Sequence, residues 1–571
     1  MNKSIAFWLF LFMSLCCKPS PPGIKTLIDD YVGEWKKFYP TEAFNNGDRP
    51  SAFMFEDFSD EILREWIDFN RKTKKKIEEI KAALSFDDKI DADQLTQRID
   101  LELERWIHDR VLRNSAQFYY EQISGALTYV LVRHYLSVKE KRIAVCNRLE
   151  GIRRLCRLGV EKLENGRPCS TRLSIDLFED LSSFFKEKLP CIAQTWMDAG
   201  NFKKFNEACL ETVDCLDSLS VHIKNSVMPG MSLPDGIGRD NFARKLRINT
   251  LMDLSPEQLA EKALEDFAGT KEDIRRAAIE YYAEKEPGNR LPDDFKALMQ
   301  KITDSLHAFR ADNTSDFLSL YRDLAHRVER FVIDEKIATV PFRRTYVVEL
   351  SPRQLARWGG VFWSGAFDPD ATTLFYISWI PDDAPEPEKE AFYKRYNIPF
   401  VNVLIAHELF PGHYLQGKYA ANNPRICRSI FALPIYTEGW ATLSQKVILD
   451  AGWAENNKLV LLANLCAQLR ATASAIYSVK VHCEGWDFAK TAEFADVSGL
   501  KSPQNSQYLM HRVMNLPFLN LSYYLGYSVL VKHYIAEKER LGDAFELRDF
   551  MDKILEAGTV PMYAIPAILK R

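Results

Sequence analysis

Two histidines and a glutamate of this chain have the types and spacing of a hydrolytic metal site: His407, Glu408 and His413. Such a zinc site needs neutral imidazole ligands, a third ligand that is often a carboxylate, an open position for water, and a base beside that water. His407 and His413 are therefore candidate ligands, and Glu408 is the candidate base. A chain of this composition in random order would contain this arrangement only about 0.02 times. The alternative, a core or capped His407 beside a surface Glu408, stays open.

The spacing of the two histidines is incompatible with an unbroken helix. In the usual His-Glu-x-x-His pattern the second histidine lies one turn after the first, on the same helix face. His413 lies six residues after His407, so an ideal helix would carry it about 120° off that face and about 9 Å along the axis. Pro411 lacks an N–H and would clash with the carbonyl of residue 407, while Gly412 allows backbone angles closed to other residues. The sequence therefore predicts a kink or bulge that returns His413 to the metal.

Glu438 is the predicted third ligand, because it lies 25 residues after His413. Gluzincin-type peptidases take a glutamate ligand from a later helix at about this distance. Thr437 is a candidate N-cap for a helix that starts here. The alternative is that Glu438 is an ordinary carboxylate near a helix N-terminus, where the helix dipole favours it.

Helices are predicted to position these residues. Only 25 of the 571 residues are glycine, about 4% against a usual value near 7%, which disfavours a turn-rich β architecture. Apolar residues recur with helical spacing between about 25 and 335, as at Ile62, Trp66 and Phe69. Ser255 and Gln258 have the pattern of a capping box at a helix start. The predicted fold class is mainly α.

One stretch departs from the helical pattern. Residues 345–350 and 373–379 are rich in β-branched and aromatic side chains, which predicts a small β-sheet within about 340–385. We predict a single domain over residues 24–571, in which a helical N-terminal half (24–335) precedes a metal-site half (336–571).

The net charge and the N-terminal segment indicate which binding partners and which cellular location to expect. The 75 Lys+Arg and 79 Asp+Glu residues give a net charge of -4, which disfavours a nucleic-acid partner. The apolar run Ile5–Leu15 is shorter than the roughly 20 residues of a membrane-spanning helix and is typical of a secretory signal. Cys16 and Cys17 follow, and then a proline-rich stretch, so residues 1–23 are predicted to be a signal peptide and lipoprotein tether. An ordinary export signal with a periplasmic product, or a cytosolic chain, are the alternatives.

Four motifs of the chain are distinctive: HELFPGHYLQ at 407–416, EGWA at 438–441, LGDAFELRDF at 541–550 and GTVP at 558–561. Through these motifs the chain resembles a known bacterial family, domain of unknown function 885. The resemblance implies a mainly helical zinc metallopeptidase of the neurolysin and carboxypeptidase Taq type, with a deep channel between helical halves. The chain departs from the family pattern at four positions, where Gln445 replaces an acid, Ser474 an arginine, Ser478 an aspartate and Met551 a histidine.

The resemblance also indicates candidates for stabilising an oxyanion, which needs a Tyr, His or Arg donor. Tyr523, Arg512 and His482 match family positions, and we expect them to matter in that order. Their alternatives are structural roles: a core aromatic for Tyr523 and an ordinary ion pair for Arg512.

The predicted function is zinc-dependent hydrolysis of oligopeptides, with Glu408 as general base. The four departures favour an alternative, a non-catalytic surface lipoprotein that keeps the fold as a binding module. Metal-dependent hydrolysis of a non-peptide amide or ester is a third hypothesis, because the same activated water can attack any acyl group.

We predict that the mature chain begins at Cys16 or Cys17 and carries lipid, because a short apolar run ends at these cysteines. Mass spectrometry of the native N-terminus measures this directly. An intact Met1 in a soluble cytosolic fraction would contradict the prediction.

Overall fold

The computed structural model describes residues 23–133, 135–355, 359–500, 509–510 and 512–571. The predicted signal peptide and tether, apart from Gly23, lie outside the described residues. The fold is mainly α with one small sheet, as predicted.

The chain begins with a series of helices that contains no strand among its described residues up to the sheet. They are α1 (Ile24–Phe38), α2 (Pro40–Asn45), α3 (Asp60–Ile80), α4 (Phe86–Leu103), α5 (Val111–Asn114), α6 (Ala116–Val132), α7 (Val138–Lys162), α8 (Pro168–Ser183), α9 (Leu189–Ala193), α10 (Ala199–His222), α11 (Arg239–Thr250), α12 (Pro256–Lys285), α13 (Phe295–Ala308) and α14 (Thr314–Asp334). Local signals set some of these boundaries. Ser255 and Gln258 form the predicted capping box of α12, with each side chain bonded to the other's backbone N–H. Trp66 is buried as expected, but Ile62 of the same predicted face is exposed.

The predicted sheet has three strands, β1 (Tyr346–Leu350), β2 (Gly360–Phe362) and β3 (Thr373–Ile377). Their order is β1-β3-β2, with β3 parallel to β1 and antiparallel to β2. Phe375 is the central register position, opposite Val348 on one side and Val361 on the other. Every residue of β3 is buried, as expected for a short central strand covered on both faces.

Helices resume after the sheet and continue to the C-terminus. They are α15 (Glu386–Arg395), α16 (Ile398–Glu408), α17 (His413–Ala421), α18 (Cys427–Ile430), α19 (Pro434–Asp450), α20 (Lys458–Glu484), α21 (Phe488–Val497), α23 (Pro517–Leu541), α24 (Leu547–Ala557) and α25 (Ile565–Leu569). Within the described part of the chain, α20 is the helix long and apolar enough to span a membrane, but it is mostly buried and packs against α12 and α23. Its composition is that of a core helix.

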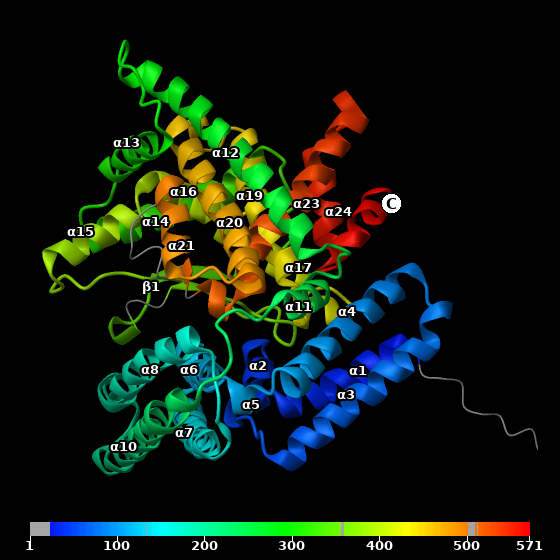
Figure 1. Cartoon of the computed structure of the whole chain (residues 1–571), viewed down its shortest axis with the longest axis vertical. Coiled ribbons are helices and arrows are strands. Elements are labelled where there is room, and N and C mark those ends of the chain that lie inside the picture. The colour runs from blue at the N-terminus through cyan, green and yellow to red at the C-terminus, as the bar shows by residue number, and fades with distance from the viewer. Residues whose placement is uncertain (1–22, 134, 356–358, 501–508, 511) are drawn as a thin grey trace, which may run out of the picture.

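Two large hydrophobic cores contain most of the buried apolar side chains of the described residues, and neither follows the expected boundary at 335. The first, which we call the N-terminal core, is built mainly from α1–α10, includes Trp35 and Phe178, and also takes in α18. The second, the metal-site core, is built mainly from α11 onward and includes Phe242 and Trp440. Helices α11–α14 therefore pack with the metal-site half. Figure 1 shows the blue and cyan helices of the N-terminal core below the green-to-red helices of the other.

A buried ion pair joins the two halves of the molecule. Asp91 of α4 accepts a 2.6 Å hydrogen bond from Nε of Arg428 in α18, and both side chains are only 4% exposed. Arg428 also donates to the carbonyl of Ala557 at the end of α24. Arg425 adds a second cation to Asp91 and bonds Asp88 at 3.0 Å. These bonds connect the N-terminal core to the segment between α17 and α19.

We expect Asp91→Ala to destabilise the fold by about 3 kcal/mol, because it removes the buried carboxylate partner of Arg428 and leaves only the more exposed Asp87, at 3.2 Å, as an ion-pair partner. Urea unfolding measures this. The matched control is Glu34→Ala, which removes the exposed partner of Lys37 and should cost under about 1 kcal/mol. Equal effects from both substitutions would contradict a role for burial.

Candidate metal centre

Helix α16 carries His407 and Glu408 in its last turn. Asn397 caps its N-terminus by accepting a hydrogen bond from the Phe400 N–H at 3.0 Å, and Pro399 lies in the first turn. The helix is buried along most of its length, so it is fixed in the metal-site core. His407 is 7% exposed, whereas Glu408 is half-buried at the helix end.

The chain leaves the helix after Glu408 and starts α17 at His413, so the predicted interruption is present. The Gly412 N–H reaches back to the carbonyl of Ala406 at 3.1 Å. A Cβ on Gly412 would lie only 2.0 Å from the His407 carbonyl oxygen. Its φ is −70° and its ψ is −140°, and glycine is required here for space. The Trp440 indole fixes the break by donating to the Pro411 carbonyl at 2.9 Å.

Glu438 lies in the second turn of α19. This helix begins at Pro434 with Leu433 as its N-cap, so the prediction that Thr437 caps it is wrong. The Thr437 hydroxyl instead lies inside the first turns and contacts the Pro434 carbonyl. Beside Glu438, a Cβ on Gly439 would lie 2.5 Å from the backbone of Gly526 in α23. The two helices therefore pack backbone against backbone, which brings the α23 side chains up to Glu438.

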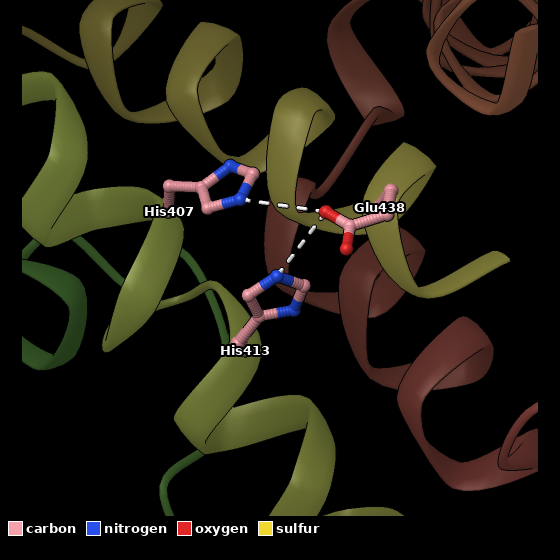
Figure 2. Close-up of side chains that lie close together, drawn as sticks. All are labelled: His407, His413 and Glu438. Atoms are coloured by element: carbon pink, nitrogen blue, oxygen red, sulfur yellow. Dashed lines mark ion pairs between the residues drawn. The ribbon is translucent and has the colours of Figure 1, made fainter. Parts of the chain in front are cut away.

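Figure 2 shows the three predicted ligands directed toward one point. Oε2 of Glu438 lies 3.6 Å from Nε2 of His407 and 3.4 Å from Nε2 of His413. The three ligand atoms lie within 4.8 Å of one another. Ligand atoms of a tetrahedral zinc, at about 2.0–2.1 Å from the metal, are separated by roughly 3.3 Å. The spacing thus fits one small cation between the three groups.

The carboxylate of Glu438 is the feature that most needs a cation. Its Oε2 atom is buried and has no hydrogen-bond partner. Burial alone would raise the pKa of Glu438, but the adjacent rings of His407 and His413 hold that pKa well below its usual range. Burial likewise lowers the pKa of His413, yet Glu438 and Glu408 outweigh it and the net pKa is raised. The site therefore favours an anionic Glu438 and a positive charge beside it.

Tyr523 and Arg512 lie at the same centre. The Tyr523 ring stacks on His407, with centroids 6.1 Å apart and planes 13° apart. Burial raises the pKa of Tyr523 well above its usual value, and the Glu438 and Glu408 charges raise it further, against the opposing charge and hydrogen bond of Arg512. The phenol is consequently protonated at neutral pH and can donate a hydrogen bond.

His482, the third candidate oxyanion donor, has its ring nitrogens bonded to backbone groups. Its Nε2 lies 3.0 Å from the Val513 carbonyl, and its Nδ1 accepts from the Ile237 N–H at 3.4 Å. The ring also stacks on Phe242. Burial lowers the pKa of His482 to about 4, so the ring is neutral. Both nitrogens are used to fasten α20 to neighbouring backbone.

Three of the four residues that depart from the family pattern have ordinary structural contacts. The Ser474 hydroxyl donates to the Arg470 carbonyl, and the Ser478 hydroxyl to the Ser474 and Pro517 carbonyls. Met551 is fully buried in the metal-site core. Gln445, the fourth, lies beside a candidate ligand, with its Nε2 2.9 Å from Nδ1 of His407.

A family model for bacterial proteins of unknown function, DUF885, matches residues 40–568. The chain belongs to this family. The expected family membership is therefore confirmed over nearly the whole chain of this DUF885 protein. No curated protein matches it.

Two solved structures share the DUF885 chain's fold. One is described as a "putative lipoprotein of unknown function" from Shewanella oneidensis, with 17% identity, a TM-score of 0.76, and coverage of 96% of this chain and 100% of the other. The second is described as a "putative lipoprotein" from Colwellia psychrerythraea, with 16% identity, a TM-score of 0.76, and coverage of 96% and 98%. At these identities the likeness shows the fold alone.

Some residues of the DUF885 site were not predicted from its sequence. The Trp363 ring meets the ring of His413 edge-on at 5.8 Å. Trp440 and Gly439 fix the backbone around the candidate ligands. Both lie inside a sequence motif, so their positions could have suggested a supporting role. Trp363 directly follows β2, and no spacing connects it with His413.

We expect Gly412→Ala to displace His413 and weaken zinc binding by roughly tenfold or more, because supporting contacts of metal ligands are typically worth that much. Metal analysis after dialysis against a zinc buffer measures this. Gly269→Ala is the matched control, since a Cβ there meets nothing within 4 Å. Unchanged affinity in Gly412→Ala would contradict our account of the spacing between the histidines.

Proposed function

We propose that this protein is a zinc-dependent hydrolase that acts on peptides, with His407, His413 and Glu438 as the metal ligands. The observation that carries the proposal is the buried Oε2 of Glu438, which has no hydrogen bond and lies 3.4–3.6 Å from two imidazole nitrogens. Two neutral imidazoles and one carboxylate are a common donor set of catalytic zinc sites, which keep a fourth position for water.

A zinc ion bound there supplies Lewis acidity and lowers the pKa of water toward neutrality. The protein's own contribution begins with Glu408. This carboxylate follows His407 directly and forms no hydrogen bond or salt bridge within the described residues. It is available to accept a proton from the attacking water and to pass it to the leaving amine.

Tyr523 and Arg512 are proposed to stabilise the oxyanion that forms as water attacks the carbonyl. Tyr523 stays protonated because burial and the neighbouring carboxylates raise its pKa, so it retains a proton to donate. Arg512 hydrogen-bonds Tyr523 and supplies a positive charge nearby. Donors of this kind act where negative charge develops, and one such donor is typically worth about 10²–10³ in rate.

An oligopeptide is the proposed substrate. All three ligands are at least 85% buried as side chains, with 9%, 12% and 15% exposed for His407, His413 and Glu438. An extended peptide segment is narrow enough to approach such a centre, whereas the surface of a folded protein is not. The predicted channel between helical halves would be the route.

The location of the activity is proposed to be outside the cytoplasm, on a membrane to which lipid anchors the chain. The apolar run before Cys16 and Cys17 supports this. The two structural neighbours described as putative lipoproteins point the same way. The anchor is the proposed membrane attachment, and nucleic acid is not a proposed partner.

We expect Glu408→Gln to keep zinc and folding but to lower peptide hydrolysis about 10²- to 10⁴-fold, because Gln keeps the shape and loses the proton-accepting charge. His413→Ala should instead lower zinc occupancy. Zinc content and cleavage of a mixed oligopeptide library measure the two effects, with the exposed Glu335→Gln as control. Hydrolysis within a few-fold of the parent in Glu408→Gln would contradict the mechanism. A parent with zinc but no hydrolysis would favour the binding module.

A further inference from the structure

One glutamine contacts a candidate histidine ligand. Nε2 of Gln445 lies 2.9 Å from Nδ1 of His407, and both side chains are buried. The other ring nitrogen of His407, Nε2, lies 3.6 Å from Oε2 of Glu438. The imidazole of His407 thus directs Nε2 at Glu438 and is held from its other side by an amide.

The helix geometry makes the support of His407 rigid. Gln445 follows Glu438 by seven residues in α19, and seven residues return to almost the same helix face. One face of α19 therefore supplies both the third ligand and the side chain that holds the first. Close packing of α19 on α23 at Gly439 and Gly526 leaves this face little freedom to rotate.

The chemistry of an amide differs from that of the carboxylate that often holds a metal-binding histidine. A histidine that binds metal through Nε2 carries its proton on Nδ1 and needs an acceptor there, commonly a carboxylate, a carbonyl or water. A carboxylate adds negative charge that strengthens the ligand, whereas an amide adds none. An amide also presents a donor at one end and an acceptor at the other. By exchanging the positions of its amide nitrogen and oxygen, Gln445 can hydrogen-bond Nδ1 of His407 both without metal and with it.

We propose that Gln445 is a positioning residue of the metal centre, and that its neutral amide keeps metal affinity below the value that a carboxylate would give. The proposal rests on the metal site proposed above and concerns how that site is tuned. Because the Gln445 amide can remain hydrogen-bonded to His407 in both states, the centre can release and regain its metal without leaving this buried ring nitrogen unpaired. An exchangeable metal ion follows from this arrangement.

The test measures zinc affinity of the full chain by competition with a chromogenic chelator. Gln445→Met should weaken zinc binding about 10- to 100-fold, the usual effect of removing such a support. Gln445→Glu should tighten it by roughly tenfold or more and slow zinc release. The matched control is Gln468→Met, which removes a partly buried glutamine that bonds Tyr527 and should leave affinity unchanged.

A second readout separates positioning from ligation and from misfolding. The visible spectrum of bound Co²⁺ should indicate the same coordination number in all variants, since neither of these glutamines is a proposed ligand. Thermal unfolding of the metal-free variants should stay near that of the parent. Parent-like zinc affinity in both Gln445→Met and Gln445→Glu would overturn this proposal and leave the metal site intact. A parent that binds no zinc would overturn the metal site and this proposal together.

Discussion

The centre of this molecule depends on one buried negative charge. Glu438 is held inside the metal-site core, and the oxygen that faces the two histidines has no hydrogen bond. An uncompensated carboxylate at such a position would cost several kcal/mol, so the fold must keep positive charge or protons beside it. His407 and His413 lie 3.6 Å and 3.4 Å from this oxygen, and a divalent cation bound between the three groups would supply that charge. The surrounding segments can be understood as the means of holding these three groups together.

Backbone approach, rather than side-chain packing, fixes the ligand positions. Gly412 lies against the carbonyl oxygens at the end of α16, and Gly439 lies against Gly526 of α23. Any Cβ at these positions would overlap backbone atoms, which cannot move aside as a flexible side chain can. Trp440, the neighbour of Gly439, bonds the Pro411 carbonyl between the two histidine helices. A few residues thus couple three helices at the point where their ligands converge.

The division of the molecule into two cores places all of this in one unit. The three candidate ligands, Glu408 and Tyr523 belong to helices of the metal-site core, and α11–α14 complete that core although they precede the sheet. The N-terminal core contributes no ligand but is fastened to the same region through Asp91 and Arg428, close to the chain between α17 and α19. Its packing can therefore influence the segment that connects two of the ligands.

The sequence by itself determined the features that depend on local chemistry. Helical periodicity and capping residues gave the mainly α class, β-branched segments gave the short sheet, and Pro411 with Gly412 gave the helix break, because each follows from backbone preferences of nearby residues. The ligand candidates followed from residue types that few other roles require. Tertiary structure alone decided the rest. The sequence offered Thr437 as a cap, whereas α19 starts at Pro434. It also could not show that Val513 and Ile237, distant in sequence, hydrogen-bond the ring of His482. The boundary between the two cores likewise depends on which helix faces pack together. Long-range packing decides these contacts, and no local sequence pattern encodes them.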